Sequence, residues 1–204
     1  MDAWMITSTD KWTCISTKDP VRVTGSFYFK QDKNHDEIPY QWIKAQMSAR
    51  LSLPPSPHIY PIQVYTQWEG KKKPDLRSIR YGWAKSIEWV LVTLSISKRK
   101  ILLADEDLWT CVLGHWYIAD DEIEAARHEA RYNPHPFTVY ERRRYRDKQF
   151  QAEVRKSWEK IFDISSKKTL YRMPIKERSI MGWIWEIPKD SIIQTKNFRG
   201  ALQL

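Results

Sequence analysis

Clusters of Lys and Arg are the residues whose type and spacing point most directly to a binding chemistry. The chain has 34 Lys and Arg against 25 Asp and Glu, a formal net charge of +9, and the excess is concentrated rather than evenly spread. A cation that neutralises a phosphate releases condensed counterions, so such clusters favour polyanions, nucleic acids above all. The alternative is an ordinary solvated surface. The clusters are Lys71-Lys72-Lys73, Lys98-Arg99-Lys100, Arg142-Arg143-Arg144 with Arg146 and Lys148, and Lys167-Lys168.

Several standard catalytic motifs are missing. Neither GxxxxGK[ST] nor GxGxxG occurs, and six glycines leave little room for a phosphate-cradling loop, so P-loop hydrolysis is not expected. The five histidines show neither HExxH nor a pairing with Cys at ligand spacing, so no metal is expected. There is no GxSxG, and a thiol nucleophile would have to be Cys14 or Cys111, both of which we expect to be buried.

The elements that must position functional residues follow from periodicity and capping. Apolar alternation and β-branched or aromatic residues predict strands at 3–12, 21–29, 58–68, 87–97, 168–173, 179–187 and 191–198. Apolar spacings of three and four predict helices from Asp36 to Leu51, from an Asp105 cap through Trp116, and from Asp120 to Arg131. A long basic helical segment follows the prolines of 133–137 and buries Val154, Trp158, Ile161 and Phe162.

The arrangement of these elements predicts the fold class. Strands at both ends with helices between them favour an α+β fold in which helices flank a mixed sheet, and 204 residues suit a single domain over 1–204. Eleven tryptophans supply much of the core, and we expect some of them to line a cleft. No apolar stretch approaches the roughly 20 residues that cross a bilayer, and no secretory signal is visible, so we expect a cytoplasmic protein without a membrane partner.

Six segments spread almost end to end along the chain have distinctive sequences. They are YPI at 60–62, QWEGKKKPDLR at 67–77, ILLADEDLW at 101–109, VLGHWY at 112–117, SWEKIFDI at 157–164 and WEIPKDSI at 185–192. Together they resemble an uncharacterised bacterial family, the domain of unknown function numbered three-eight-four-one, whose name implies no reaction. One departure is Glu106 in Asp105-Glu106-Asp107, where an aromatic residue is expected between the two acids.

A second resemblance lies in the order of the elements. A Trp-bearing first strand, an early helix, an extended segment with a basic turn and a late strand ending in a carboxylate are similar to the ADP-ribosyltransferase fold. That resemblance implies a split, strongly bent sheet, NAD as a substrate in its cleft, and a catalytic glutamate that holds the nicotinamide ribose. The matching residue is Glu186. A fixed carboxylate stabilises the positive charge that develops on the sugar as nicotinamide leaves. The alternative is an outward-facing strand residue before a proline turn.

The same resemblance implies further contacts with NAD. Arg77 would grip the pyrophosphate through paired hydrogen bonds, or it would pair with Asp75 or another surface acid instead. Trp4 and Thr7, on the opening strand, would contact NAD or merely pack within the sheet. Tyr65 offers a ring for stacking, although aromatic residues at alternate strand positions usually belong to a core.

Two functions of different classes follow. The first is an NAD-dependent ADP-ribosyltransferase that modifies a macromolecule, with RNA favoured. Such an enzyme would resemble the toxin of a bacterial defence or toxin–antitoxin system, and it would need a neutralising protein partner. The alternative is a non-catalytic nucleic-acid-binding module. A third reading is an interaction subunit whose exposed tryptophans dock a protein. The residues expected to contact nucleic acid are Trp68, Lys71, Lys72, Lys73, Arg142, Arg143 and Arg144.

Overall fold

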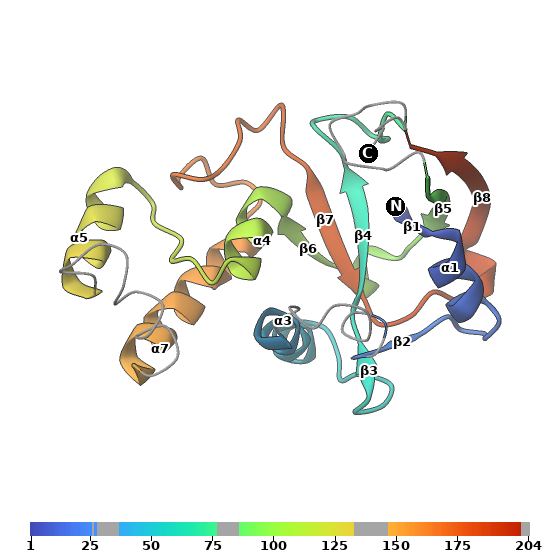
Figure 1. Cartoon of the computed structure of the whole chain (residues 1–204), viewed down its shortest axis with the longest axis horizontal. Helices are drawn as coiled ribbons and strands as arrows, with labels where there is room; N and C mark the ends of the chain where they lie inside the picture. Colours follow the sequence, from blue (N-terminus) through green and yellow to red (C-terminus); the bar gives the residue numbers. More distant parts are fainter. Residues whose placement is uncertain (26, 28–36, 77–85, 133–146, 201–204) are drawn as a thin grey trace. The chain divides into compact units, whose positions relative to one another are not determined.

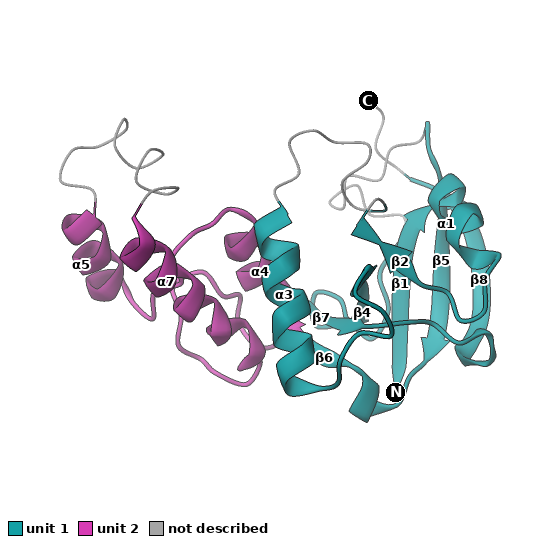
Figure 2. Cartoon of the chain, turned by 90° about the horizontal axis from the view of Figure 1, so that it is seen from below, with its two compact units in different colours: residues 1–103, 179–204 teal, residues 104–178 magenta. Residues whose placement is uncertain are grey.

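The computed structural model describes residues 1–25, 27, 37–76, 86–132 and 147–200 (Figure 1). The chain forms two compact units, which are described one at a time (Figure 2). Unit 1 comprises residues 1–103 and 179–204, and unit 2 comprises residues 104–178. Helices and a largely antiparallel sheet occur together, so the predicted α+β class is confirmed.

Unit 1 is built on a six-stranded sheet with the order β6-β7-β4-β1-β5-β8. Its pairs β4–β7, β4–β1, β1–β5 and β5–β8 are antiparallel. A second, two-stranded sheet pairs β2 with β3. The bounds are β1 Asp2–Ser8, β2 Val23–Thr24, β3 Ile59–Tyr60, β4 Ile62–Gln67, β5 Glu88–Ser95, β6 Leu102–Asp105, β7 Ile180–Ile184 and β8 Ile192–Arg199.

Strand pairing is less extensive along the line between β1 and β4 than along the line between β1 and β5. Strand β1 pairs with β5 along its whole length, from Asp2 opposite Ser95 to Ser8 opposite Trp89. Between β1 and β4, the in-register pair is Trp4 opposite Tyr65. We call this line the β1–β4 seam. In-register pairing along this line is therefore less extensive than between β1 and β5.

Strand β7 is buried at every position and depends on a glycine for its fit. All of Ile180–Ile184 is buried, as expected for an inner strand with both faces covered. A Cβ on Gly182 would lie 2.6 Å from Cγ1 of Ile101 and would also meet its Cδ1. The side chain of Ile101 therefore occupies the space that any other residue at 182 would need.

Gly182→Ala is expected to destabilise the protein by about 1–3 kcal/mol, because overpacking a filled core forces side chains off their rotamers. Ile101→Val removes the methyl group nearest the new Cβ and should recover part of that loss. Urea unfolding of the two single variants and the double variant measures this coupling. Strictly additive effects would show that Ile101 is not what excludes a side chain at 182.

One helix of unit 1 forms where apolar spacing predicts it, whereas another begins inside the predicted first strand and was not predicted. Helix α3, Glu37–Arg50, buries Tyr40, Ile43 and Met47 at the predicted spacing. The first predicted strand is shorter than expected: it ends at Ser8, whose hydroxyl accepts a hydrogen bond from the Lys11 N–H and caps helix α1, Thr9–Ser16. Two short 3-10 helices, η2 Lys98–Lys100 and η4 Lys189–Ser191, complete the unit.

Unit 2 is helical. Its elements are α4 Glu106–Leu113, α5 Glu122–Tyr132, α7 Lys148–Ser157 and the 3-10 helix η3 Trp158–Phe162. Asp105 caps α4 as predicted, its Oδ1 accepting from the Leu108 N–H at 3.3 Å. Val154, Trp158 and Ile161 are buried as expected, whereas Phe162 is half-buried. None of the helices among the described residues is long and apolar enough to cross a bilayer.

A buried cluster of one acid and two arginines ties the 163–178 segment to α4. Asp105 is 0% exposed, and its Oδ2 lies 2.9 Å from Nε of Arg172 and 3.7 Å from Nε of Arg178, whose side chains are 1% and 4% exposed. Arg172 also donates to the carbonyl oxygens of Lys160 and Ser166, and Arg178 to those of Ile164 and Met173. The guanidinium N–H groups of the two arginines thus contact several backbone carbonyls as well as the carboxylate. Together these contacts hold the irregular segment in place.

Four other sequence predictions of local structure were wrong. Among the described residues of the strand expected at 21–29, only Val23–Thr24 form a strand. The segment expected to be a strand at 168–173 is irregular, with a turn at residues 170–171, because Thr169 has φ 140° and Arg172 points inward to Asp105. Trp116 lies beyond the end of α4 and is 48% exposed. Cys14 is exposed rather than buried, since α1 buries only Ile15; Cys111 is buried as predicted.

Candidate functional site

Glu186 lies two residues after the end of β7 and is fixed by an arginine from the other end of the sequence. The backbones of Val21 and Ile187 bridge one another through N–H···O bonds of 2.8 and 2.9 Å. This bridge places Arg22 beside Glu186, and Nε and Nη2 of Arg22 both donate to Oε2 of Glu186, at 2.8 and 2.7 Å. The two side chains are 40% and 29% exposed. The carboxylate is therefore oriented but still reachable from solvent.

A cavity of about 300 Å³ adjoins this carboxylate, and we call it the Glu186 cavity. Its walls combine apolar side chains with two cations, Arg99 and Lys100. The Trp185 indole N–H donates to the carbonyl oxygen of Ser52 at 3.0 Å, which fixes one wall. The lining residues are Leu51, Ser52, Leu53, Pro55, Arg99, Lys100, Trp185 and Glu186.

A second cavity, of about 440 Å³, lies beside helix α1, and we call it the α1 cavity. Arg22 lines it, so the Arg22–Glu186 pair contributes one residue to each cavity. The lining residues are Ser8, Asp10, Lys11, Cys14, Ile15, Lys18, Arg22, Val23, Thr24 and Phe27.

The residues expected to contact NAD on the first strands lie apart from Glu186. Trp4 and Thr7 are buried, and neither they nor the half-buried Tyr65 line either cavity. Tyr65 is opposite Met181 in the β4–β7 register, and Glu186 follows Met181 by five residues, about 16 Å of extended chain. Trp4, Thr7 and Tyr65 thus belong to the β1–β4 seam and its neighbourhood, not to the Glu186 cavity. Arg77 lies outside the described residues.

The expected nucleic-acid contacts are only partly at the surface. Trp68 is buried and packs on Tyr65, with ring centroids 4.3 Å apart, so its ring is no open platform for a base. Trp68 and Lys71 exchange backbone hydrogen bonds of 2.8 and 2.7 Å around Glu69 and Gly70, both with positive φ, as in a type I′ turn. Lys71, Lys72 and Lys73 are exposed on and after this turn, whereas Arg142, Arg143 and Arg144 lie outside the described residues.

The charge of the chain resides almost entirely in unit 1. By sequence, unit 1 has 19 Lys and Arg against 11 Asp and Glu, whereas unit 2 has 15 against 14. Of the formal charge of +9, unit 1 thus carries +8. This unit, which also contains both cavities, is the one to which a polyanion would be attracted.

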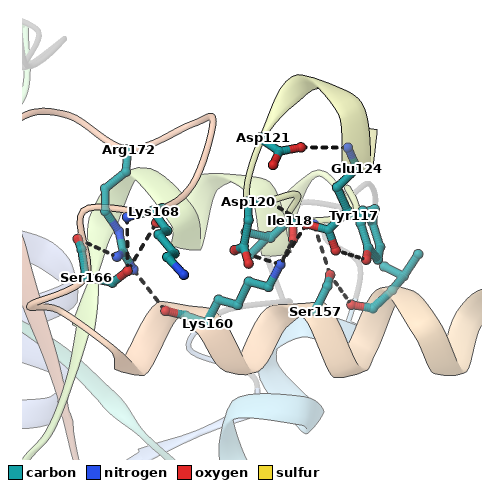
Figure 3. A network of polar contacts seen from close by, with 11 residues as sticks. Tyr117, Ile118, Asp120, Asp121, Glu124, Ser157, Lys160, Ser166, Lys168 and Arg172 are labelled. Atoms are coloured by element: carbon teal, nitrogen blue, oxygen red, sulfur yellow. Dashed lines mark hydrogen bonds and ion pairs between the residues drawn. The ribbon is translucent and has the colours of Figure 1, made fainter. Parts of the chain in front are cut away.

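Unit 2 contains a polar network at the start of α5, shown in Figure 3. The hydroxyl of Tyr117 donates to Oε1 of Glu124 at 2.6 Å. Nζ of Lys160 donates to the Ile118 carbonyl oxygen at 2.9 Å and lies 2.9 Å from Asp120 and 3.3 Å from Glu124. Burial alone raises the pKa of the Glu124 carboxyl, but hydrogen bonds from Tyr117 and the Asp120 N–H, with the charge of Lys160, lower it. Lys160 of η3 thus contacts one carbonyl oxygen and two carboxylates of residues 118–124 and holds that segment against η3.

His128 of α5 is buried against this network. Its ring stacks on that of Tyr117 with centroids 3.8 Å apart, and its Nε2 has no hydrogen-bond partner among the described residues. Burial lowers the pKa of His128, outweighing the opposing charge of Glu153. The unfolded chain, with an ordinary His pKa near 6.5, therefore takes up a proton in a pH range where the folded chain does not.

The free energy of unfolding is accordingly expected to fall as the pH is lowered through about 6.5, and His128→Phe should flatten that part of the profile. Urea unfolding of both proteins between about pH 5 and pH 7 measures the difference. An unchanged slope in the Phe variant would mean that this histidine does not supply the pH dependence.

A comparison with known protein families shows to which family the chain belongs. The profile of one family, Domain of unknown function (DUF3841), matches residues 3–193. The chain belongs to this family. DUF3841 membership confirms the end-to-end resemblance and supplies no reaction. Comparisons with curated proteins and with solved structures find no match.

For this DUF3841 chain, sequence reasoning missed Arg22, the residue that orients Glu186. No local signal marks it, because the two residues are 164 positions apart and meet only through the Val21–Ile187 bridge. In the part of the chain that the structure covers, no three His, Cys, Asp or Glu side chains gather in a way that would hold a metal ion.

Proposed function

We propose that this protein is an NAD-dependent ADP-ribosyltransferase-like enzyme that modifies a macromolecule, with RNA favoured as the target. The observation that carries the proposal is the position of Glu186. Its carboxylate is held by Arg22 at 2.7 and 2.8 Å, borders a cavity with Arg99 and Lys100 in its lining, and remains 29% exposed. A preoriented anion beside two cations suits a substrate that is cationic at its reacting ring and anionic at its phosphates.

Glu186 would act on the bond between the ribose C1′ and the nicotinamide nitrogen. As that bond breaks, the electron pair leaves with nicotinamide and positive charge develops on the sugar. The fixed carboxylate stabilises this charge without having to reorient. A nucleophilic oxygen or nitrogen of the target then bonds to C1′ and loses its proton to solvent. Orientation by Arg22 supports the role because it removes the freedom that an isolated surface glutamate would have.

The uneven pairing of β1 with its two neighbours also supports the proposal. The ADP-ribosyltransferase resemblance implies a split sheet, and the β1–β4 seam is a line along which strand pairing is reduced to Trp4 opposite Tyr65. In this proposal Trp4 and Thr7 pack the sheet beside the seam, because both are buried. The reacting ribose lies at Glu186.

The experiment that tests the proposal follows the label of adenylate-³²P NAD into macromolecules. The purified chain is incubated with labelled NAD and, separately, with RNA, DNA and a protein mixture. Label that co-migrates with RNA and is removed by ribonuclease supports the proposal as stated. Label found only in DNA or protein overturns the choice of RNA, and no label in any fraction overturns the transferase.

A second candidate function, nucleic-acid binding without catalysis, is favoured by the exposed Lys71, Lys72 and Lys73 and by the charge of unit 1. Replacing these three lysines by Glu is expected to weaken RNA binding and to make the slope of log K against log salt shallower by about 2, at roughly 0.7 per phosphate contact on a single strand. Fluorescence anisotropy at several salt concentrations measures both. An unaltered slope would place the RNA elsewhere on the protein.

A further inference from the structure

The α1 cavity has no part in the chemistry proposed for Glu186. Its charged lining residues are Asp10, Lys11, Lys18 and Arg22, three cations against one acid. Arg22 is already engaged by Glu186, which leaves Lys11 and Lys18 as cations for a ligand. Lys11 belongs to α1 itself, and Lys18 follows the end of that helix.

The remaining walls of the α1 cavity suit an organic ligand rather than a simple ion. Ile15 and Val23 are buried and line the cavity together with Phe27. Nζ of Lys11 lies 5.4 Å from the centroid of the Phe27 ring, so a cation and an aromatic face share one side of the space. A volume of about 440 Å³ falls within the range of small-molecule sites, which combine apolar walls with a few polar groups.

We propose that the α1 cavity binds a phosphorylated ligand of mononucleotide size, with its phosphate at Lys11 and Lys18 and its ring system against the apolar wall. Two flexible ammonium groups in the lining of a partly apolar cavity can bind a phosphate as point charges, and the apolar walls are then left for the ligand's ring. The inference does not depend on catalysis by Glu186.

A cysteine of the cavity provides a direct reporter. Cys14 lines the α1 cavity and is exposed. The other thiol, Cys111, is buried, and burial together with the charges of Asp107 and Asp105 raises its pKa to about 11. A thiol reagent therefore modifies Cys14 first, since reactivity follows exposure and thiolate content. A ligand in the cavity shields Cys14.

The experiment measures the rate at which N-ethylmaleimide modifies Cys14 in the full chain, by intact-mass spectrometry. AMP and ADP-ribose are expected to slow modification at least tenfold at saturation, and adenosine, which lacks the phosphate, is not. Inorganic phosphate, added alone, shows whether the phosphate group is sufficient for protection. If phosphate alone protects Cys14 as strongly as AMP does, the ring system of the ligand does not contribute to binding. Weaker protection by phosphate alone supports a contribution from the ring.

The variant Lys11→Gln/Lys18→Gln is expected to lose the protection by AMP. The matched control, Lys189→Gln/Lys196→Gln, removes two exposed lysines of the same unit that do not line the cavity. This control variant should retain the protection by AMP. The proposal is overturned if AMP fails to slow modification at millimolar concentration, if adenosine protects equally, or if the Lys11/Lys18 variant retains protection. Because the assay needs no turnover, its outcome is separate from that of the label-transfer experiment.

Discussion

Glu186→Gln is expected to lower the transfer of label from NAD by at least about 100-fold, the loss typical of removing one group that stabilises developing charge in an active site. The substitution removes the charge and keeps the size and one acceptor oxygen. Transfer to RNA by the variant and the unaltered chain, at equal protein concentration, gives the ratio. A Gln variant that retains more than about a tenth of the activity would show that this carboxylate does not stabilise the reacting sugar.

The fold should survive this change, which makes the activity loss interpretable. The Arg22–Glu186 pair is partly exposed, and such pairs contribute about 0–1 kcal/mol. Asp190→Asn is the matched control, because Asp190 is an exposed acid four residues further along that lines neither cavity. Arg22→Ala should reduce transfer less than Glu186→Gln, since it frees the carboxylate without removing it.

Asp105→Ala is expected to destabilise the protein by about 3–5 kcal/mol, the largest effect on stability that we foresee. The substitution removes the carboxylate that lies within 4 Å of the buried guanidinium groups of Arg172 and Arg178, and uncompensated buried charge is strongly unfavourable. It also removes the cap of α4, worth about 1 kcal/mol. Urea unfolding followed by circular dichroism measures the sum.

Two further variants separate these contributions. Asp105→Asn keeps the oxygen that caps α4 and loses the charge, so it should be nearly as destabilising as Asp105→Ala. Asp190→Ala, at an exposed position, should change stability by less than about 0.5 kcal/mol. If the Asp105→Asn protein were as stable as the unaltered chain, the charge of the carboxylate would not be needed to hold Arg172 and Arg178 in place.

Local signals in the sequence predicted most of the regular elements. Ile43 and Met47 share one face of α3, and Val90, Val92 and Leu94 alternate along β5, because each pattern depends only on neighbours along the chain. The same holds for the Asp105 cap, which needs an acceptor three residues before its donor. These features follow from the geometry of one element and need no knowledge of the rest.

Features that depend on distant residues escaped prediction. Arg172 and Arg178 look like surface charge in the sequence, yet both side chains are buried around an acid more than sixty positions earlier. Arg22 and Glu186 meet through a pair of backbone hydrogen bonds between chain segments that no periodicity links. Glu186 itself was singled out by resemblance, and the cavity beside it depends on Leu51–Pro55 and Arg99–Lys100, which come from elsewhere in the chain.

Release of free nicotinamide by the purified chain, measured by chromatography after incubation with NAD and RNA, tests the account most directly. We predict that nicotinamide accumulates in step with labelled RNA and that the Glu186→Gln protein releases at least about 100-fold less. Nicotinamide at the level of a protein-free blank, from a chain shown to be folded, would contradict the role proposed for Glu186.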